Sequence, residues 1–220
     1  MRSKIFTRTV GYWPLQESSG QAYDYSGNEN HASTANVSSY GVSGPVGSSA
    51  MDFDGTDDEI VVDSALPSGD RLTLAAWWRY EGSDSSRHSV VGYFENINLK
   101  VDDSDDNLEV HVQTDAEGWS NTQQPVSGLK NTWNFAVVRY DGNTVELYNN
   151  GRKIGSFSKT GNLNQPASSM KIGRRADNTE PFNGKIAHVR IWDYPLPEAS
   201  IRALYNASRG GFGQSDSKTI

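Results

Sequence analysis

Trp119 and its polar neighbours are the residues best suited to hold a ligand. Trp119 lies in residues 114–124, TDAEGWSNTQQ, a polar segment that we expect to be a loop with no need to bury a tryptophan. Sugars present C–H faces that stack on aromatic rings, and a ring loses little entropy when it is bound. Trp119 and the nearby amide of Asn121 therefore predict contact with a carbohydrate, although the sequence equally allows the ring to fold back onto the domain.

Four further side chains are candidates for ligand binding. Trp77 and Trp78 are adjacent in an apolar strand pattern, so they point to opposite faces. One of them belongs to the core, and the other lies on an outer or concave face unless a loop covers it; we take Trp78 as the candidate for ligand binding. Tyr93, Arg174 and Arg175 lie in predicted loops and complete the set, although structural contacts within the domain would explain each of them as well.

No residue pattern predicts catalysis. The sequence has neither a G-x-S-x-G elbow nor an H-E-x-x-H zinc motif. His31, His88, His111 and His188 are isolated from one another along the chain, and single histidines are usually surface or structural residues. We therefore predict that the protein is not an enzyme and has no catalytic residue.

Composition limits the remaining possibilities. The chain has 220 residues, no cysteine and a formal net charge of −7. Without cysteine there is no disulfide or thiolate metal site, and an acidic surface argues against non-specific nucleic-acid binding. No apolar run reaches the ~18 residues of a membrane helix, so we expect no membrane insertion. The excess of 17 aspartates over 10 glutamates also suits a protein that works in high salt.

Short strands must position these side chains. Apolar and polar residues alternate with a period of two, which is typical of half-buried strands. We predict strands over residues 72–80, 107–113, 133–140, 144–148, 152–157 and 185–192, and one short helix over 197–205. The turns at Asp141-Gly142 and Asn150-Gly151 predict hairpins, because these residue types tolerate positive φ. Together the elements predict an all-β fold of two antiparallel sheets with one short C-terminal helix.

Six motifs in a fixed order resemble the laminin-G-like, concanavalin A-like jelly-roll domains. They are GYWPL and DYSGNEN within residues 11–30, MDFDGTDDEIVV at 51–62, LTLAAWW at 72–78, WNFAVVRY and LYNNG within 133–151, KIG, FNGKI and VRIW within 171–192, and the helix PEASIRALY at 197–205. The resemblance implies a jelly-roll β-sandwich over residues 9–208, with loops gathered at its rims. It also implies carbohydrate or glycoprotein ligands, which a fold alone does not establish.

The resemblance further implies a calcium site in the first loop. Relatives hold calcium there with an aspartate and backbone carbonyls, and Asp24 is at the matching position with Asn28 and Asn30 close by. Relatives often add a second aspartate where this chain has Ala187. One anionic ligand is therefore missing, and a plain Asx turn at Asp24 is the alternative.

Other carboxylate patterns do not predict sites. Related glycosidases carry E-x-D-x-x-E on one strand, so that two carboxylates flank the glycosidic bond, and Glu109 with Asp115 does not reproduce that spacing. The acidic run at residues 102–106 is interpreted as a hairpin tip, and the run at 54–59 as a turn of the family.

The function that we predict is binding or structural. Domains of this family are usually extracellular, yet residues 1–8 are not followed by the apolar segment of a secretion signal. A virion surface protein, such as a capsid decoration, turret or fibre-head protein, would explain both observations. The alternative is a cellular or secreted lectin-like carbohydrate-binding module, and a polysaccharide-degrading enzyme of the same fold is the least favoured.

Two short arms flank the predicted domain. Residues 1–8 are basic and residues 209–220 are rich in glycine and serine, so we expect both to need neighbours that order them. The expected neighbours are structural protein subunits in a homo-oligomeric assembly. The other expected partner is a cell-surface glycan or glycoprotein, and the expected location is the virion surface or, in the alternative, the cell surface or extracellular space.

Overall fold

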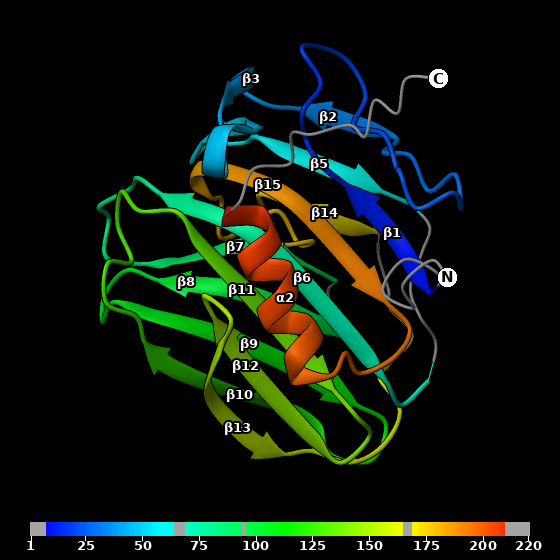
Figure 1. Cartoon of the computed structure of the whole chain (residues 1–220). Coiled ribbons are helices and arrows are strands. Elements are labelled where there is room, and N and C mark those ends of the chain that lie inside the picture. The colour runs from blue at the N-terminus through cyan, green and yellow to red at the C-terminus, as the bar shows by residue number, and fades with distance from the viewer. Residues whose placement is uncertain (1–7, 64–68, 94–95, 165–168, 210–220) are drawn as a thin grey trace.

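The computed structural model describes residues 8–63, 69–93, 96–164 and 169–209. The strands in these residues form two antiparallel sheets that pack face to face as a jelly-roll sandwich (Figure 1). This confirms the all-β, two-sheet fold with one short C-terminal helix that the sequence predicts.

The larger sheet has eight strands, ordered β13-β12-β11-β6-β15-β4-β3, with β1 paired to β15. These strands are β13 (Arg152–Ser158), β12 (Thr144–Asn149), β11 (Asn134–Tyr140), β6 (Leu72–Tyr80), β15 (Asn183–Trp192), β4 (Ser49–Asp54), β3 (Ser39–Ser43) and β1 (Thr9–Trp13). A 3-10 turn, η1 (Pro45–Gly47), connects β3 to β4.

The smaller sheet has seven strands, ordered β10-β9-β8-β7-β14-β5-β2. These strands are β10 (Gly118–Pro125), β9 (Asn107–Thr114), β8 (Ile97–Asp102), β7 (Arg87–Gly92), β14 (Met170–Ile172), β5 (Glu59–Val62) and β2 (Thr34–Asn36). Strands β7 to β10 follow one another in the chain and in space, so they form a meander of hairpins.

Alternating side chains place the inner face of each sheet in one core. Leu74, Ala76 and Trp78 of β6 belong to the same buried cluster as Val110 and Val112 of β9. The intervening residues of each strand must point away from that core. The outer faces of the two sheets are therefore the surfaces left for a helix or a ligand.

Helix α2 (Glu198–Arg209) covers the outer face of the larger sheet (Figure 1). It begins directly after Pro197, whose fixed φ suits the start of a helix. Trp77 and Phe135 pack beneath it, and Tyr205 stacks on Trp77 with ring centroids 5.8 Å apart. Ile201 is fully buried in the same cluster. One outer face is thus occupied, and the outer face of the smaller sheet is left for function.

Two local predictions are wrong. Residues 118–125 form strand β10 and not a loop. The sequence does not predict this edge strand because it is polar on both faces and lacks the apolar alternation typical of inner strands. Trp78 is fully buried between the sheets and Trp77 lies beneath α2, so neither is exposed.

The predicted arms lie almost entirely outside the described residues. The expectation that they contact other subunits concerns residues 1–7 and 210–220, and it stays a prediction. At the boundary, Arg8 forms an ion pair with Asp193, with 3.0 Å between Nε and Oδ1.

Candidate functional site

The outer face of the smaller sheet is polar. In β9, Val110 and Val112 enter the core, so Glu109 and His111 point outward. The antiparallel register places Asn121 of β10 directly opposite His111, on the same face. Polar side chains from neighbouring strands therefore meet on this surface.

A hollow of about 330 Å³ lies on this face, and we call it the Trp119 hollow. Its lining residues are Arg87, His111, Trp119, Ser120, Asn121 and Arg175. The Trp119 side chain is 44% exposed, and its ring meets the His111 ring edge to face with centroids 6.0 Å apart. An indole held in this way offers an open apolar surface beside polar groups.

Glu109 lies beneath the hollow and anchors three of its lining side chains. Its carboxylate accepts hydrogen bonds from Arg87 Nε at 2.8 Å, from Asn121 Nδ2 at 2.9 Å and from His111 Nε2 at 2.7 Å. Its side chain has no exposed surface. Burial alone would raise the pKa of Glu109, but the hydrogen bonds from His111 and Asn121 and the charges of His111 and Arg87 lower it to about 2. The carboxylate is therefore ionised and works as a fixed acceptor.

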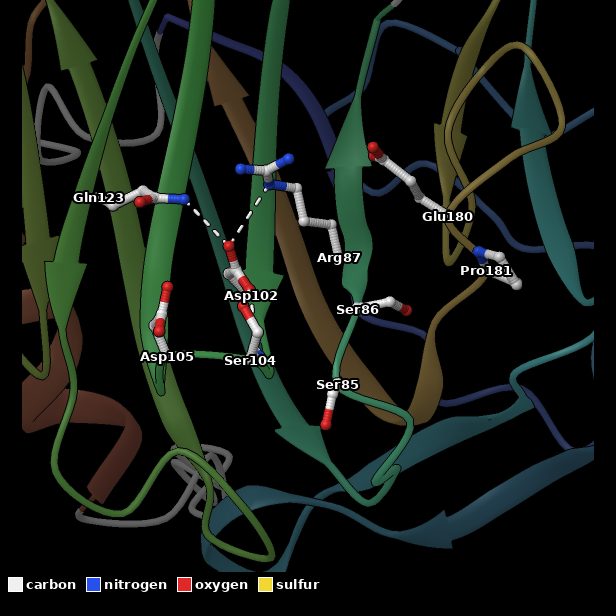
Figure 2. A pocket seen from close by; sticks show the side chains of 9 residues that line it. All are labelled: Ser85, Ser86, Arg87, Asp102, Ser104, Asp105, Gln123, Glu180 and Pro181. Carbon is white, nitrogen blue, oxygen red and sulfur yellow. Dashed lines mark hydrogen bonds and ion pairs between the residues drawn. The ribbon is translucent and has the colours of Figure 1, made fainter.

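A second hollow, of about 480 Å³, shares Arg87 with the first, and Figure 2 shows the side chains that line it. Its lining residues are Ser85, Ser86, Arg87, Asp102, Ser104, Asp105, Gln123, Glu180 and Pro181, and we call it the Asp102 hollow. Gln123 Nε2 donates to Asp102 Oδ2 at 3.0 Å, and Arg87 Nε lies 3.4 Å from the same oxygen. Arg87 lines both hollows and therefore marks their shared boundary.

Three of the predicted ligand-binding residues come together. Trp119, Asn121 and Arg175 all line the Trp119 hollow, although they come from β10 and from a loop more than 50 positions later. Arg174, in contrast, donates to the carbonyl of Asn178 at 2.9 Å, and it is absent from the described residues that line either hollow.

Two predicted binding residues are corrected by their burial. Trp78 has no exposed surface, because it belongs to the core cluster between the sheets. Tyr93 is only 2% exposed and belongs to the same cluster. Burial raises the pKa of the Tyr93 hydroxyl, as expected for a phenol without contact to water. Neither side chain can reach a ligand at the surface.

Sequence reasoning missed Arg87, Glu109 and His111 as parts of the site. The only available signal was the alternation of polar and apolar residues in 107–113, which places Glu109 and His111 on one face. Nothing in the sequence shows which strands flank β9, and that pairing is what brings Arg87 and Trp119 to these two residues.

The loop around Asp24 does not fit a calcium ion. Asp24 Oδ1 accepts the backbone N–H groups of Tyr12 and Ser26, both at 2.8 Å, and Oδ2 accepts the Ser26 hydroxyl at 2.7 Å and the Asn30 N–H at 3.0 Å. The amides of Asn28 and Asn30 donate to backbone carbonyls of β1. Calcium requires about six to eight oxygen ligands, whereas here N–H and O–H donors surround the carboxylate. The arrangement fits the Asx turn that is the alternative from the sequence.

The two acidic runs are turns. Asp54, Asp57 and Asp58 have carboxylate oxygens within 4.8 Å of one another, but Asp58 Oδ2 accepts the backbone N–H groups of Ser38 and Asp54. Residues 103–106 form the tight turn between β8 and β9, which confirms the predicted hairpin tip.

Among the described residues, no helix is both long and apolar enough to cross a membrane.

A protein-family model matches most of the chain. The family model described as the concanavalin A-like lectin/glucanases superfamily matches residues 54–202. No curated protein matches the sequence.

Several solved structures share the fold. The binding domain of Paraclostridial Mosquitocidal Protein 1 has a TM-score of 0.74 and 16% identity, over 93% of this chain and 53% of that chain. The receptor binding domain of botulinum neurotoxin D has a TM-score of 0.70 and 14% identity, over 93% and 54%. The botulinum neurotoxin serotype D ligand binding domain in complex with N-acetylneuraminic acid has a TM-score of 0.69 and 13% identity, over 92% and 51%. This chain thus spans about half the length of these structures, and at such identities the likeness shows the fold alone.

Proposed function

Because the chain belongs to the concanavalin A-like lectin/glucanases superfamily, we propose that it is a non-catalytic carbohydrate-binding module whose binding surface is the Trp119 hollow. One observation carries the proposal. The half-exposed ring of Trp119 lies beside Asn121 and His111, which are both fixed by the buried Glu109. A stacking surface next to preordered donors is the combination that sugar rings and their hydroxyl groups require.

The same geometry argues for binding over hydrolysis. Glycoside hydrolysis needs two carboxyl groups, one of which must carry a proton near neutral pH. Glu109 has a pKa of about 2 and no exposed surface, so it cannot serve as that acid. The next two outward positions on β9 are His111 and Gln113, which are not carboxylates. A polysaccharide-degrading enzyme of this fold is therefore the weaker alternative.

Replacement of the exposed indole tests the proposal. We expect the Trp119→Ala variant to bind a glycan selected from an oligosaccharide array about tenfold or more weakly than the wild type, because the stacking surface is lost. The affinities are to be measured by isothermal titration calorimetry. Tyr25→Ala is a matched control, because Tyr25 is 64% exposed and lies outside both hollows. Equal losses in the two variants, or no glycan bound by the wild type, would contradict the proposal.

The proposal extends to the setting of this binding. The similar solved structures are receptor binding and ligand binding domains, which supports a role in attaching a larger assembly to a cell surface. The assembly that we propose, from the sequence, is a virion surface, where this domain would contact structural subunits and a host glycan or glycoprotein. Immunogold labelling of purified particles with an antibody against this domain tests that setting, and particles without label would contradict it.

A further inference from the structure

The Trp119 hollow has a basic lining in an acidic protein. The formal net charge of the chain is −7. Yet the described residues that line this hollow include three bases, Arg87, His111 and Arg175, and no carboxylate. Arg175 and His111 each pair with a carboxylate outside this lining, Asp177 and Glu109 respectively. The surface that a ligand would meet is nevertheless basic, which favours a ligand that is itself negative.

Arg87 is a base whose Nη donors are available to a ligand. Its Nε is shared between Glu109 Oε2 at 2.8 Å and Asp102 Oδ2 at 3.4 Å. Neither of its two Nη groups forms a hydrogen bond or ion pair with any of the described residues, and its side chain is 48% exposed. Figure 2 shows the two Nη atoms turned away from Asp102. A planar guanidinium in this state presents the paired N–H donors that match a carboxylate.

The carboxylates beneath Arg87 hold it in place. The side chains of Glu109 and Asp102 are 0% and 4% exposed, and neither acid lines the Trp119 hollow, so a ligand in that hollow meets the guanidinium and not these acids. Each acid also has a further partner, since Asn121 donates to Glu109 and Gln123 donates to Asp102. An arginine fixed in this way loses little conformational entropy when a ligand binds.

The Asp102 hollow offers the opposite chemistry on the other side of Arg87. Asp105, Ser85 and Ser104 line it with carboxylate and hydroxyl oxygens. Carboxylate and hydroxyl oxygens both accept hydrogen bonds from neutral hydroxyl groups, and the carboxylates repel an anion. The two hollows therefore prefer different parts of one ligand, and Arg87 is the boundary at which those parts would join.

We propose that the two hollows form one continuous site for an acidic oligosaccharide. The carboxylate of one sugar binds the Nη groups of Arg87 while its ring stacks on Trp119, and the neighbouring neutral sugar lies in the Asp102 hollow. The inference rests on the proposed function, because it names the class of glycan that the same surface takes.

The test compares each acid with its own methyl ester. An array carries sialic-acid and uronic-acid oligosaccharides, each printed beside its methyl-esterified form. Calorimetry then measures the best-bound acid and its ester. We expect the ester to bind about tenfold to a hundredfold more weakly, because it loses a charged hydrogen-bonded pair. We also expect the affinity for the acid to fall between about 50 mM and 500 mM salt, as screening of an exposed charge requires.

Variants of Arg87 assign the preference to this residue. In Arg87→Gln, the acid and the ester should bind within about threefold of each other, because the charged donors are gone. If the uncompensated Glu109 prevents folding, the double variant R87Q/E109Q removes both charges and tests the same point. Arg202→Gln on α2 is the matched control and should keep the full preference, since Arg202 pairs with Glu198 on the opposite side of the sandwich.

The outcomes separate this inference from the proposed function. Equal binding of acids and esters, or a preference that survives in both Arg87 variants, overturns the acidic ligand while Trp119-dependent binding still supports a carbohydrate-binding module. Binding of no glycan on the array overturns both.

Discussion

Glu109 shows how one buried acid can organise a binding surface. It accepts hydrogen bonds from three of the side chains that line the Trp119 hollow and is itself closed off from water. Since its carboxylate must remain ionised to accept them, the Nε2 of His111 must carry the proton that it donates. The order of the hollow is thus linked to the ionisation of a single group.

The pH dependence of stability should report this link. The pKa of Glu109 is about 2 in the folded protein, against an ordinary value of 4.5. A carboxyl with a lowered folded pKa stabilises the native state above its unfolded pKa, and the stabilisation is lost as the pH falls towards the folded value. We expect Glu109→Gln to be less stable than the wild type by about 3 kcal/mol at pH 7, and this gap should shrink as the pH falls from about 4.5 towards 2.

Urea unfolding of both proteins at pH 7, 5 and 3 measures the gap. Glu198→Gln is the control, because Glu198 is half-exposed and forms a surface pair with Arg202. That variant should differ from the wild type by only about 0.5 kcal/mol at every pH. A gap for Glu109→Gln that is constant across the three conditions would show that its ionisation does not stabilise the fold.

At the scale of elements, strands with an apolar face could be predicted and a polar edge strand could not. Strand β6 runs over Leu72–Tyr80, as predicted, because its apolar run reflects burial on both faces, beneath the second sheet on one side and beneath α2 on the other. The Asn150-Gly151 turn also forms, with φ of 51° and 77°. Strand β10 could not be predicted because it is held by backbone pairing with β9. Backbone pairing does not require a particular pattern of side chains.

Helix α2 should contribute measurably to stability through its buried face. Ile201 has no exposed surface and packs in the cluster that contains Trp77 and Phe135. We expect Ile201→Ala to lower the free energy of unfolding by about 2–4 kcal/mol, because it removes buried methyl groups and leaves a cavity. Arg202→Ala, on the exposed face of the same helix, should change it by about 0.5 kcal/mol or less. Urea titrations followed by tryptophan fluorescence measure both, and similar small effects would mean that α2 is loosely held.

At the scale of the whole molecule, the site is a product of topology. Trp119 could be selected from the sequence because a polar segment rarely carries a tryptophan without a role. Asn121 and Arg175 could be named only as candidates, since Arg174, which has the same claim as Arg175, does not line the hollow. Arg87 and His111 could not, because each resembles an ordinary strand residue until β7, β8, β9 and β10 are placed in register. The exclusion of Trp78 likewise depends on knowing which face of β6 meets the second sheet.

The first and last strands of the domain, β1 and β15, are in contact at His188. Strand β1 pairs with β15, and His188 interrupts the pairing of β15 with β6 by a bulge with φ of 52°. Tyr12 Oη lies 2.9 Å from His188 Nδ1, and the guanidinium of Arg190 lies 3.7 Å from the centre of the Tyr12 ring. Burial, and to a lesser degree the charge of Arg190, lowers the pKa of His188 to about 3.

This histidine should make the closed fold sensitive to mild acid. Because the unfolded chain takes up a proton near pH 6.5 and the folded chain does so only near pH 3, stability is full above about 6.5 and falls as the pH drops through that window. The loss between pH 7 and pH 5 should be about 2 kcal/mol.

His188→Asn should flatten this part of the curve, because asparagine tolerates the positive φ and does not titrate. Glu109→Gln should keep the wild-type slope between pH 7 and pH 5, since Glu109 titrates at lower pH. Unfolding free energies at pH 7, 6 and 5 decide the matter, and equal slopes for the wild type and His188→Asn would remove His188 as the cause.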